Sequence, residues 1–535
     1  MKKRLLASLL CLAMLVGLLA ACGGGGGTNE ATPPPADGGT PAITTTPEPA
    51  PEGATFQSHI RIAQPSDLPS NTPYGEHATQ TAVLTNSTFS RLVDVDTSDF
   101  SILPALATTW ESNEDSTVWT FHLRDDVQFH NGEHFTANDV KFTFEYAGSA
   151  DNEGIMAAIV GAAYIDEIVV EDDYTITFYL NRSTADWLIY ASQKIMSQAS
   201  VERYGIDVGG SIGTGPFRFE SHNPGVSWTI VRFDDYWGEL PVTEQITSVV
   251  IPDAAARSLA LEAGDVEAVF APAITDIPRF LHNDDINVFR AESISTIFLA
   301  INTGRPAGED MRVRQAIAMA VNRNDIALAA FEGGEMGVPG YNFINSVTMG
   351  HAPVDAFSLD LDAARALLSE AGYDANNRLQ LELYTFALML PIAEIIQHSL
   401  AQVDIDVHIT EWAQSGFSAN IREDGGFDLY VQQSSQSGGV LNIIQRFITA
   451  DGDANLMQYN SPELEALFQS ALDAASWDEM MYYYALIQQH IAYEVPLVPL
   501  IQQYLWVLGA SNVGGINLSN QPNFVDFSNV FAVEQ

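Results

Sequence analysis

Cysteine, basic residues and long apolar runs are all scarce in this chain of 535 residues. Lys and Arg together number 23 against 68 Asp and Glu, which gives a formal net charge of −45 at pH 7. A polyanion of this size repels nucleic acid and anionic membrane surfaces, so we expect no nucleic-acid partner. The nucleotide-binding pattern G-x-x-x-x-G-K-[ST] is also absent, so the chain does not encode an ATPase of that kind.

The acidic residues are dispersed along the chain and do not form charged tails. This pattern favours a solvated surface that keeps a protein soluble over a surface built to attract cationic ligands. Weak enrichment of cations near a cleft stays open as an alternative.

The one long apolar run lies at the start of the chain, from Leu5 to Leu19, and follows Lys2, Lys3 and Arg4. Small residues and then five glycines come after it, and the run is too short for an ordinary membrane-spanning helix. The layout is typical of a secretory signal peptide, which we place at residues 1–21.

Residues Leu19 to Cys22 resemble the lipobox of bacterial lipoproteins. The resemblance implies a mature chain that begins at Cys22, carries lipid on this thiol and is held to a membrane by it. Cleavage there would remove Cys11, so no disulfide could form within the mature chain. Residues 22–55 are rich in Gly, Pro, Thr and Ala and have no aromatic residue before Phe56, a composition that predicts a disordered tether.

The remaining residues, about 480, are enough for two or three hydrophobic cores, so we expect several α/β domains. Residues 118–124 alternate with a period of two, which predicts a half-buried strand, and Thr136 to Asp139 predicts the start of a helix. Hairpins are predicted in Tyr164–Leu180 and Gly213–Gly238. Helices are predicted at 312–330, 360–372, 391–403 and 462–493, with strands at 379–384 and 406–410.

Several stretches together resemble one family, the extracellular solute-binding proteins, family 5, of ABC importers. They occur in the family's order and cover the body from about Phe56 to Gln535. The stretches are "LPALATTWESNEDSTVWTFHLRDDVQFHNGEHFTANDVKFTFEYA", "GTGPFRF" with "DDYWG", "IPDAAARSLALEAGDVEAVF", "FLAINT" with "MRVRQAIAMAVNRNDI", "LDAARALLSEAGYD", and "QYNSPELEALFQSAL" with "VPLVPL".

The resemblance implies a two-lobed periplasmic-binding-protein-like α/β fold of the class II, or cluster C, type, with a hinge and no cofactor. Lobe I would comprise residues 56–83, 213–300 and 498–535, with a strand-rich insertion at 84–212. Lobe II would comprise residues 301–497. Hinges are expected near Ser211–Gly215 and Ala300–Thr303, although the glycines fit an ordinary strand-entry turn equally well.

The implied function is that of a monomeric receptor at the outer face of the cell membrane, or in a periplasm, that delivers a peptide-like ligand to an ABC permease. An oligosaccharide, a glycoside or a nickel chelate is the alternative ligand. A ligand-sensing receptor and a serine hydrolase are alternatives from other classes.

Peptide-binding members of the family hold the peptide ammonium with an aspartate in a Trp-x-x-Asp stretch beyond a "FD" strand. Here the strand is Phe427–Tyr430, and Ser434 and Ser437 stand where the tryptophan and the aspartate would be. A buried charge pair depends on both of its partners. The change predicts a neutral pocket of hydroxyl groups that includes Ser434, Ser435 and Ser437.

Arg422 precedes that strand by five residues, a spacing at which some family members carry an arginine that meets a ligand carboxylate. A surface ion pair with Glu423 or Asp424 is the alternative. Trp412 and Phe417 could stack on a ligand, or simply belong to the core.

Asn71, Thr72 and Tyr74 of lobe I follow the first strand, where the family places a ligand-contacting loop. Turn formation is the alternative for this loop. Phe270 is predicted as an apolar wall of the cleft, with plain burial as the alternative.

Two sequence patterns that are typical of a catalytic serine and of a metal site lack the structural context that such sites need. Residues 209–213 match G-x-S-x-G around Ser211, but a turn and a strand follow where a helix should begin, so we expect no catalytic residue. His122, His130 and His134 lie on a strand and around a turn without helical spacing or a cysteine partner, so we predict structural roles and no metal site.

Overall fold

The protein was analysed as a computed structural model. It describes residues 49–75, 78–96, 100–149, 161–184, 186–330, 337–413, 416–435, 439–474, 476–518 and 525–534. The predicted signal peptide, the lipidation site Cys22 and most of the predicted tether lie outside these residues.

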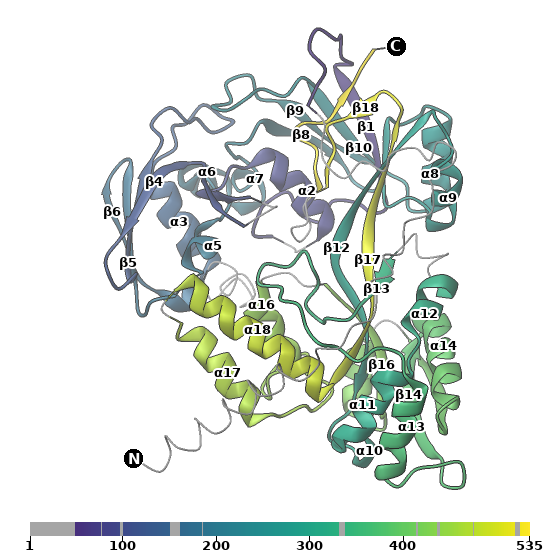
Figure 1. Ribbon diagram of the computed structural model, residues 1–535. Coiled ribbons are helices and arrows are strands. Elements are labelled where there is room, and N and C mark those ends of the chain that lie inside the picture. Colours follow the sequence, from purple (N-terminus) through teal and green to yellow (C-terminus); the bar gives the residue numbers. More distant parts are fainter. Residues whose placement is uncertain are drawn as a thin grey trace, which may run out of the picture. The chain divides into compact units, whose positions relative to one another are not determined.

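Helices are concentrated in the second half of the chain, as the sequence predicts (Figure 1). They are α2 (Thr79–Thr88), α3 (Ala137–Ala147), α5 (Trp187–Ala191), α6 (Gln198–Tyr204), α7 (Ile206–Gly209), α8 (Ala254–Glu262), α9 (Ile277–Phe280), α10 (Pro306–Glu309), α11 (Met311–Ala320), α12 (Arg323–Ala330), α13 (Leu361–Glu370), α14 (Leu390–Ala401), α15 (Phe417–Asp424), α16 (Gly439–Phe447), α17 (Pro462–Leu472) and α18 (Trp477–Glu494).

Strands occur throughout. They are β1 (His59–Gln64), β2 (Val93–Val95), β3 (Ile102–Pro104), β4 (Ala107–Ser112), β5 (Val118–Leu123), β6 (Ile165–Asp172), β7 (Thr175–Leu180), β8 (Phe217–Asn223), β9 (Ser227–Arg232), β10 (Gln245–Val250), β11 (Ala268–Phe270), β12 (Ile286–Ile301), β13 (Gly337–Pro339), β14 (Leu379–Phe386), β15 (Ile405–Trp412), β16 (Leu429–Ser435), β17 (Leu497–Ala510), β18 (Val513–Gly514), β19 (Asn517–Leu518), β20 (Val525–Asp526) and β21 (Phe531–Ala532). The prediction of an α/β fold is confirmed.

The main sheet has the strand order β15-β14-β16-β12-β17-β11-β1-β10-β9-β8, with β13 paired to β17. Strands β12 and β17 are antiparallel neighbours of 16 and 14 residues that run side by side through the middle of the sheet (Figure 1). Strand β17 pairs with β11 of lobe I through residues 507–509 and with β13 of lobe II through residues 501–503, and β12 pairs with β16 of lobe II through residues 295–301. The two lobes therefore share a single pair of strands.

The register shows which way the shorter strands point. Phe270 at the end of β11 pairs with Val507, and β11 runs antiparallel to β17, so its carboxyl end points toward lobe II. Strands β1 and β10 are parallel to β11 in turn. Ser435 at the end of β16 pairs with Ser295, and β14 and β15 are parallel to β16, so these three strands end toward lobe I. The carboxyl ends of two sets of parallel strands are therefore directed at one stretch of β12 and β17.

The insertion has a sheet of its own, with the order β4-β5-β7-β6, and a separate core. The predicted strand around residue 120 is β5, and the predicted helix start is α3, which Thr136 and Asp139 begin as a reciprocal capping box. The hairpin predicted at Tyr164–Leu180 forms from β6 and β7. Its turn lies at residues 173–174.

Two of the predicted long helices are each divided in the structure. Residues 312–330 form α11 and α12, because the Asn322 side chain accepts hydrogen bonds from the backbone N–H groups of Asn324 and Asp325 and starts a second helix. Residues 462–493 form α17 and α18, and Ser476 caps α18 through the Glu479 N–H group. The other predicted helices and strands are confirmed within a few residues at their ends.

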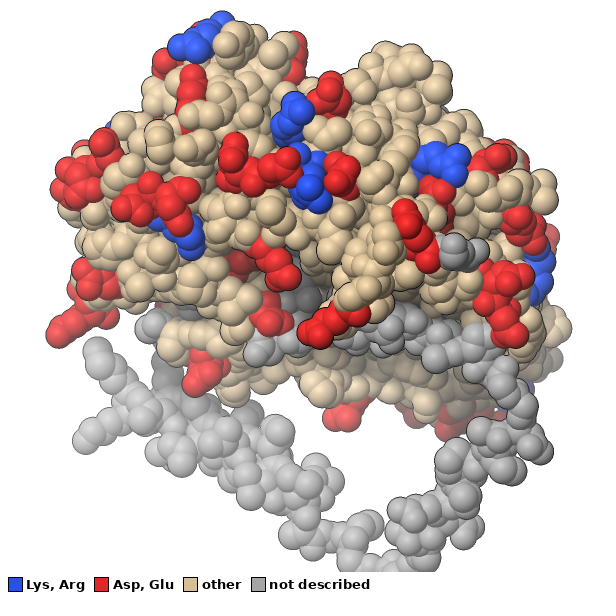
Figure 2. Space-filling model, turned by 90° about the horizontal axis from the view of Figure 1, so that it is seen from above, with Lys and Arg blue, Asp and Glu red and all other residues tan. Residues whose placement is uncertain are grey.

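Acidic side chains are scattered over the face of the molecule drawn in Figure 2, and several of them lie beside an arginine or a lysine. This distribution agrees with the expectation of a solvated acidic surface.

Candidate functional site

The loop after β1, residues 65–75, is fixed at its base by Asp67. Its carboxylate accepts hydrogen bonds from His222 Nε2 at 2.8 Å and from the backbone N–H groups of Gly225 at 2.6 Å and Leu68 at 2.8 Å. The hydrogen bond from His222 connects the loop to the hairpin formed by β8 and β9. These hydrogen bonds fix the base of the loop at the lobe I edge.

Two of the three side chains predicted in this loop already have protein partners. The Tyr74 hydroxyl donates to the Lys194 carbonyl oxygen at 2.8 Å and the ring is 6% exposed, while Thr72 is 4% exposed beside the Ser70 hydroxyl. Asn71 is half-buried. Their role as ligand contacts stays a prediction, and Asn71 has the most accessible side chain of the three.

The carboxyl end of β11 is braced from α8. Arg257 is buried and donates to the carbonyl oxygens of Ile251 at 2.6 Å, Pro252 at 2.9 Å and Ala271 at 2.5 Å. Ala271 has a backbone φ of 50°, a strained value for a residue with a Cβ atom. Phe270, the predicted apolar wall, is 5% exposed and packs in the lobe I core.

The lobe II edge contains a cavity of about 470 Å³ at the carboxyl ends of β14 and β16. Its side chains are apolar or carry amide and hydroxyl groups, and none of them is charged. The lining residues are Phe386, Leu388, Met389, Gly416, Phe417, Ser418, Ala419, Gln432 and Gln433. The cavity is therefore suited to an uncharged part of a ligand.

Of the predicted lobe II residues, Phe417 lines this cavity directly, and its ring packs edge-on against Phe386 at 5.2 Å. Trp412 lies opposite Phe386 in the β14–β15 register and packs against Tyr384, with 5.6 Å between the ring centroids. Phe417 thus serves both the lobe II core and the cavity, whereas Trp412 packs against the core beside Phe386.

Trp412 and Ser434 share an uncommon property. The indole N–H group of Trp412 and the hydroxyl of Ser434 are buried and have no hydrogen-bond partner within the described residues. Ser434 is 2% exposed, and Gln432, which lines the cavity, lies two residues earlier on the same side of β16. Unpartnered buried polar groups are rare and costly. The indole N–H group of Trp412 and the hydroxyl of Ser434 can therefore form further hydrogen bonds.

Arg422 does not form the ion pair with Glu423 or Asp424 that was the alternative to a ligand contact, and its role as a ligand contact stays a prediction. Its guanidinium donates to the carbonyl oxygen of Asp453, and the Asp424 carboxylate accepts a hydrogen bond from the Tyr384 hydroxyl at 2.6 Å. Arg422 is exposed, and one of its donors is occupied. Ser437 and the side chain of Ser435 lie outside the described part of the chain.

Neither the G-x-S-x-G pattern around Ser211 nor the group of three histidines forms a reactive site. The Ser211 hydroxyl donates to the Val208 carbonyl oxygen at 2.8 Å, and α7 precedes it where a nucleophile elbow needs a strand. His130 Nδ1 accepts from the Gly213 N–H group at 3.3 Å, so Nε2 donates to the Gly215 carbonyl oxygen at 3.0 Å. Burial lowers the pKa of His130 to about 4. Within the described ranges no group of His, Cys, Asp and Glu is arranged to hold a metal ion.

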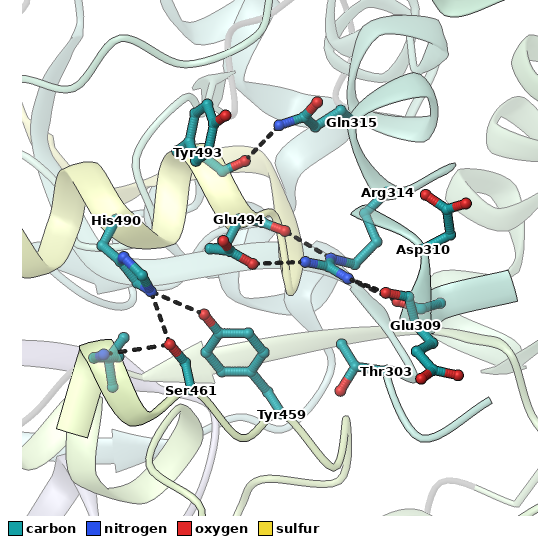
Figure 3. A network of polar contacts seen from close by, with 12 residues as sticks. Thr303, Glu309, Asp310, Arg314, Gln315, Tyr459, Ser461, His490, Tyr493 and Glu494 are labelled. Carbon is teal, nitrogen blue, oxygen red and sulfur yellow. Dashed lines mark hydrogen bonds and ion pairs between the residues drawn. The ribbon is translucent and has the colours of Figure 1, made fainter. Parts of the chain in front are cut away.

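One serine and histidine pair does lie within hydrogen-bond distance in lobe II (Figure 3). Ser461 Oγ is 3.0 Å from His490 Nε2, but the same oxygen accepts the Leu464 N–H group as the cap of α17, and the Tyr459 hydroxyl shares the same nitrogen at 3.2 Å. A nucleophile needs a base of its own. We therefore interpret this pair as part of a helix cap.

The same view shows how the end of α18 is held. Arg314 of α11 donates to the Glu494 carboxylate at 2.8 Å and to the Glu494 carbonyl oxygen at 2.6 Å, and also to the Gly308 carbonyl oxygen at 2.9 Å (Figure 3). Strand β17 begins three residues after Glu494, at Leu497. The network therefore fixes the lobe II end of the shared strands.

Comparison with known proteins assigns the family. Residues 101–445, more than half of the chain, match the model of the bacterial extracellular solute-binding proteins, family 5 Middle. The chain belongs to this family. Its members are solute-binding proteins, and the two-lobed fold expected from the sequence is confirmed.

Curated relatives within the family bind different solutes. The chain is 28% identical to the dipeptide-binding protein of Escherichia coli (strain K12) over 365 residues, which cover 61% of this chain and 66% of that protein. It is 29% identical to the nickel-binding periplasmic protein of the same organism over 354 residues, which cover 62% and 67% of the two chains. The heme-binding protein A of Haemophilus influenzae is 23% identical over 447 residues, with coverages of 77% and 81%.

Solved structures extend the likeness over the whole body. The periplasmic binding protein DppA from Helicobacter pylori, in complex with the peptide STSA, has a TM-score of 0.71 and 25% identity, with coverages of 90% and 99%. NikA from Brucella suis, in complex with Fe(III)-EDTA, has a TM-score of 0.79 and 23% identity, with coverages of 89% and 100%. The family fold thus accommodates ligands of unrelated chemistry.

No helix in the described ranges is long and apolar enough to span a membrane.

Several residues that line the lobe II cavity were not predicted from the sequence. Phe386, Leu388 and Met389 follow β14, whose strand was predicted, and Gln432 and Gln433 lie within β16. The available signal was positional, because residues at the carboxyl ends of parallel strands are the usual ligand contacts in open α/β sheets.

Proposed function

We propose that the protein is a lipid-anchored receptor outside the cell, which encloses a peptide-like solute between its lobes and delivers it to the permease of an ABC importer. One observation carries this proposal: the carboxyl ends of two sets of parallel strands are directed at the same stretch of β12 and β17. A ligand that touches both edges stabilises the closed arrangement by its differential affinity for it. Family membership supports the transport role.

The middle of β12 and β17 is a better candidate for the hinge than either segment expected from the sequence. Pairing between these strands is irregular from Glu292 to Thr296. By contrast, the Gly215 N–H group bonds to the Thr88 carbonyl oxygen at 3.1 Å, and the Asn302 N–H group bonds to the Asp428 carbonyl oxygen at 2.8 Å. Irregular ladders absorb a change of backbone angle more easily than doubly anchored turns.

The uncharged lobe II cavity favours a ligand whose amino end is blocked or absent. Among the described residues no carboxylate lines the cavity, and the buried hydroxyl of Ser434 has no partner there. A free ammonium transferred there would lose its hydration without gaining a counter-charge. Modified peptides therefore fit better than ordinary free peptides, and a neutral glycoside or a metal chelate is the second candidate for the same reason.

A thermal-shift series on the purified protein tests the proposal, because a ligand that binds only the folded state raises the melting temperature. The panel comprises free tripeptides, N-acetylated tripeptides, oligosaccharides and a nickel–histidine chelate. We expect the largest rise with N-acetylated peptides. A larger rise with the free peptides would show that another group holds the ammonium, and no rise with any peptide would refute the peptide-like ligand.

A further inference from the structure

Arg290 on β12 differs from every other arginine that the structure describes. Each of the others forms an ion pair with a carboxylate or donates to a backbone carbonyl oxygen. Arg290 has neither kind of contact within the described residues; it is paired only with aromatic rings. A guanidinium carries five N–H donors, so the half-buried Arg290 side chain can bind an anionic group.

Two rings hold the Arg290 side chain in place. Its guanidinium carbon lies 4.4 Å from the Tyr504 ring centroid and 5.5 Å from the Trp506 ring centroid, both on β17. Stacking of this kind stabilises the cation and leaves the N–H groups at the rim of the guanidinium plane free to donate. The side chain is therefore preorganised for a planar, two-oxygen acceptor.

Trp506 supplies a second, independent sign of a missing acceptor. It lies directly opposite Arg290 in the β12–β17 register and is 3% exposed. Its indole N–H group is buried and has no hydrogen-bond partner within the described residues. A buried N–H group without an acceptor is costly, so the donors of Trp506 and Arg290 on adjacent strands point to one shared anion.

Arg290 and Trp506 lie on the part of β12 and β17 between the end of β11 in lobe I and the end of β16 in lobe II. Strand β11 ends at Phe270, opposite Val507, so the Arg290 and Trp506 pair lies one step beyond this end, toward lobe II. Arg290 is on the same side of β12 as Glu292, whose carboxylate bonds to Ser346. A ligand that spans the two edges would pass this point.

Glu292 does not neutralise Arg290. Its carboxylate accepts hydrogen bonds from the Ser346 hydroxyl and, at 3.2 Å, from the Gln502 amide, and it lies more than 4 Å from any arginine that the structure describes. The chain as a whole carries a net charge of −45, which repels anions. Arg290, which has no counter-charge among the described residues, therefore offers a local binding position for a negative group.

We propose that Arg290 and Trp506 bind the carboxylate of the transported solute, with Arg290 donating through two N–H groups and Trp506 through its indole N–H group. The inference rests on the proposed function and adds the anionic end of the ligand to its uncharged end in lobe II. It also transfers the role predicted for Arg422, which donates to Asp453, to a residue on the shared strands.

The test uses the full-length protein in detergent with two probes, N-acetyl-trialanine and its C-terminal amide, and measures affinity by calorimetry. We expect the acid to bind wild type at least about 10-fold more tightly than the amide, as for hydrogen bonds to a charged group. In Arg290→Gln this preference should disappear, while binding of the amide stays as in wild type. Arg422→Gln is the matched control and should keep the preference.

Trp506→Phe keeps the stacked ring but removes the N–H group, so it remains informative even if Arg290→Gln fails to fold. We expect this variant to lower the preference for the acid by about 3-fold or more. Equal binding of acid and amide to wild type overturns the carboxylate site but leaves the proposed function standing. Binding of neither probe overturns the peptide-like ligand, and the carboxylate site with it.

Discussion

The two edges that point at the shared strands are built in different ways. At the lobe I edge three polar side chains are fully paired within the protein: Asp67 with three donors, Tyr74 with Lys194, and Arg257 with three carbonyl oxygens. Buried polar atoms without partners in the described residues occur at both edges, in Gln64 at the end of β1 and in Trp412 and Ser434 of lobe II. The difference teaches that paired side chains make the loop and the end of β11 in lobe I a platform, and that spare hydrogen-bonding groups are not confined to lobe II.

The largest effect is expected where the paired edge loses its central donor. Arg257→Met keeps the apolar stem but leaves the carbonyl oxygens of Ile251, Pro252 and Ala271 without that donor. Because Arg257 is buried and its three part-buried hydrogen bonds are lost together, we expect a loss of about 3 kcal/mol in the free energy of unfolding, measured in urea. Arg279→Met removes surface ion pairs with Glu262 and Asp276 and should cost less than about 1 kcal/mol. Equal losses in the two variants would contradict the platform interpretation.

An intermediate effect is expected from pH. Burial lowers the pKa of His130 to about 4 in the folded protein, below the ordinary value of about 6.5 in an unfolded chain. Between these values the unfolded chain binds the proton more readily, so the free energy of unfolding falls as the pH falls from about 6.5 to about 4. We expect His130 to contribute about 2 kcal/mol to this fall. In His130→Gln that part of the slope should be absent, and an unchanged slope would assign it to other groups.

The smallest effect compares one serine from each kind of environment. Ser90 donates to the Thr214 carbonyl oxygen at 3.0 Å and accepts from the Trp237 indole at 3.2 Å, whereas the buried Ser434 hydroxyl has no partner within the described residues. We expect Ser90→Ala to lower the free energy of unfolding by about 1 kcal/mol, and Ser434→Ala to leave it unchanged or raise it slightly. Denaturation curves in urea decide this. A loss at Ser434 as large as that at Ser90 would mean that the Ser434 hydroxyl is satisfied in solution.

Much of the fold could be predicted from the sequence because its signals are local. The helix start at Thr136 and the alternation around Phe121 each depend on a few neighbouring residues, and each is confirmed. Residue composition and order along the chain were likewise enough to indicate the family.

The length of β12 could not be predicted in this way. Between Phe289 and Ile301, the lobe I part of β12 alternates apolar and polar residues, whereas the lobe II part is apolar on both faces. The pattern changes because the strand passes from one environment to the other. Periodicity describes a single environment and gives no sign that a strand continues through two. The predicted boundary at residues 300–301 therefore fell at the end of the strand, whereas the irregular pairing lies earlier.

The candidate site was only partly predictable for a related reason. Phe417 and Trp412 could be selected as aromatic residues near a strand, but aromatic character alone does not separate a cavity wall from a core. The significance of Arg290 depends on the absence of a carboxylate around it within the described residues, and an absence in space leaves no trace in the order of residues. Arg422 had a suggestive spacing, but its partner, Asp453, lies 31 residues away.

The shared strands also set the distance between the end of β11 and the end of β16. Phe289 of β12 lies opposite Val507, level with the end of β11, and Ser295 lies opposite Ser435, at the end of β16. Six residues at about 3.3 Å each separate these levels by at most about 20 Å. A fully extended chain of about six residues has the same length. Unless a solute folds back or protrudes from the side, the backbone of the receptor itself therefore sets an upper bound on the cargo that it can enclose.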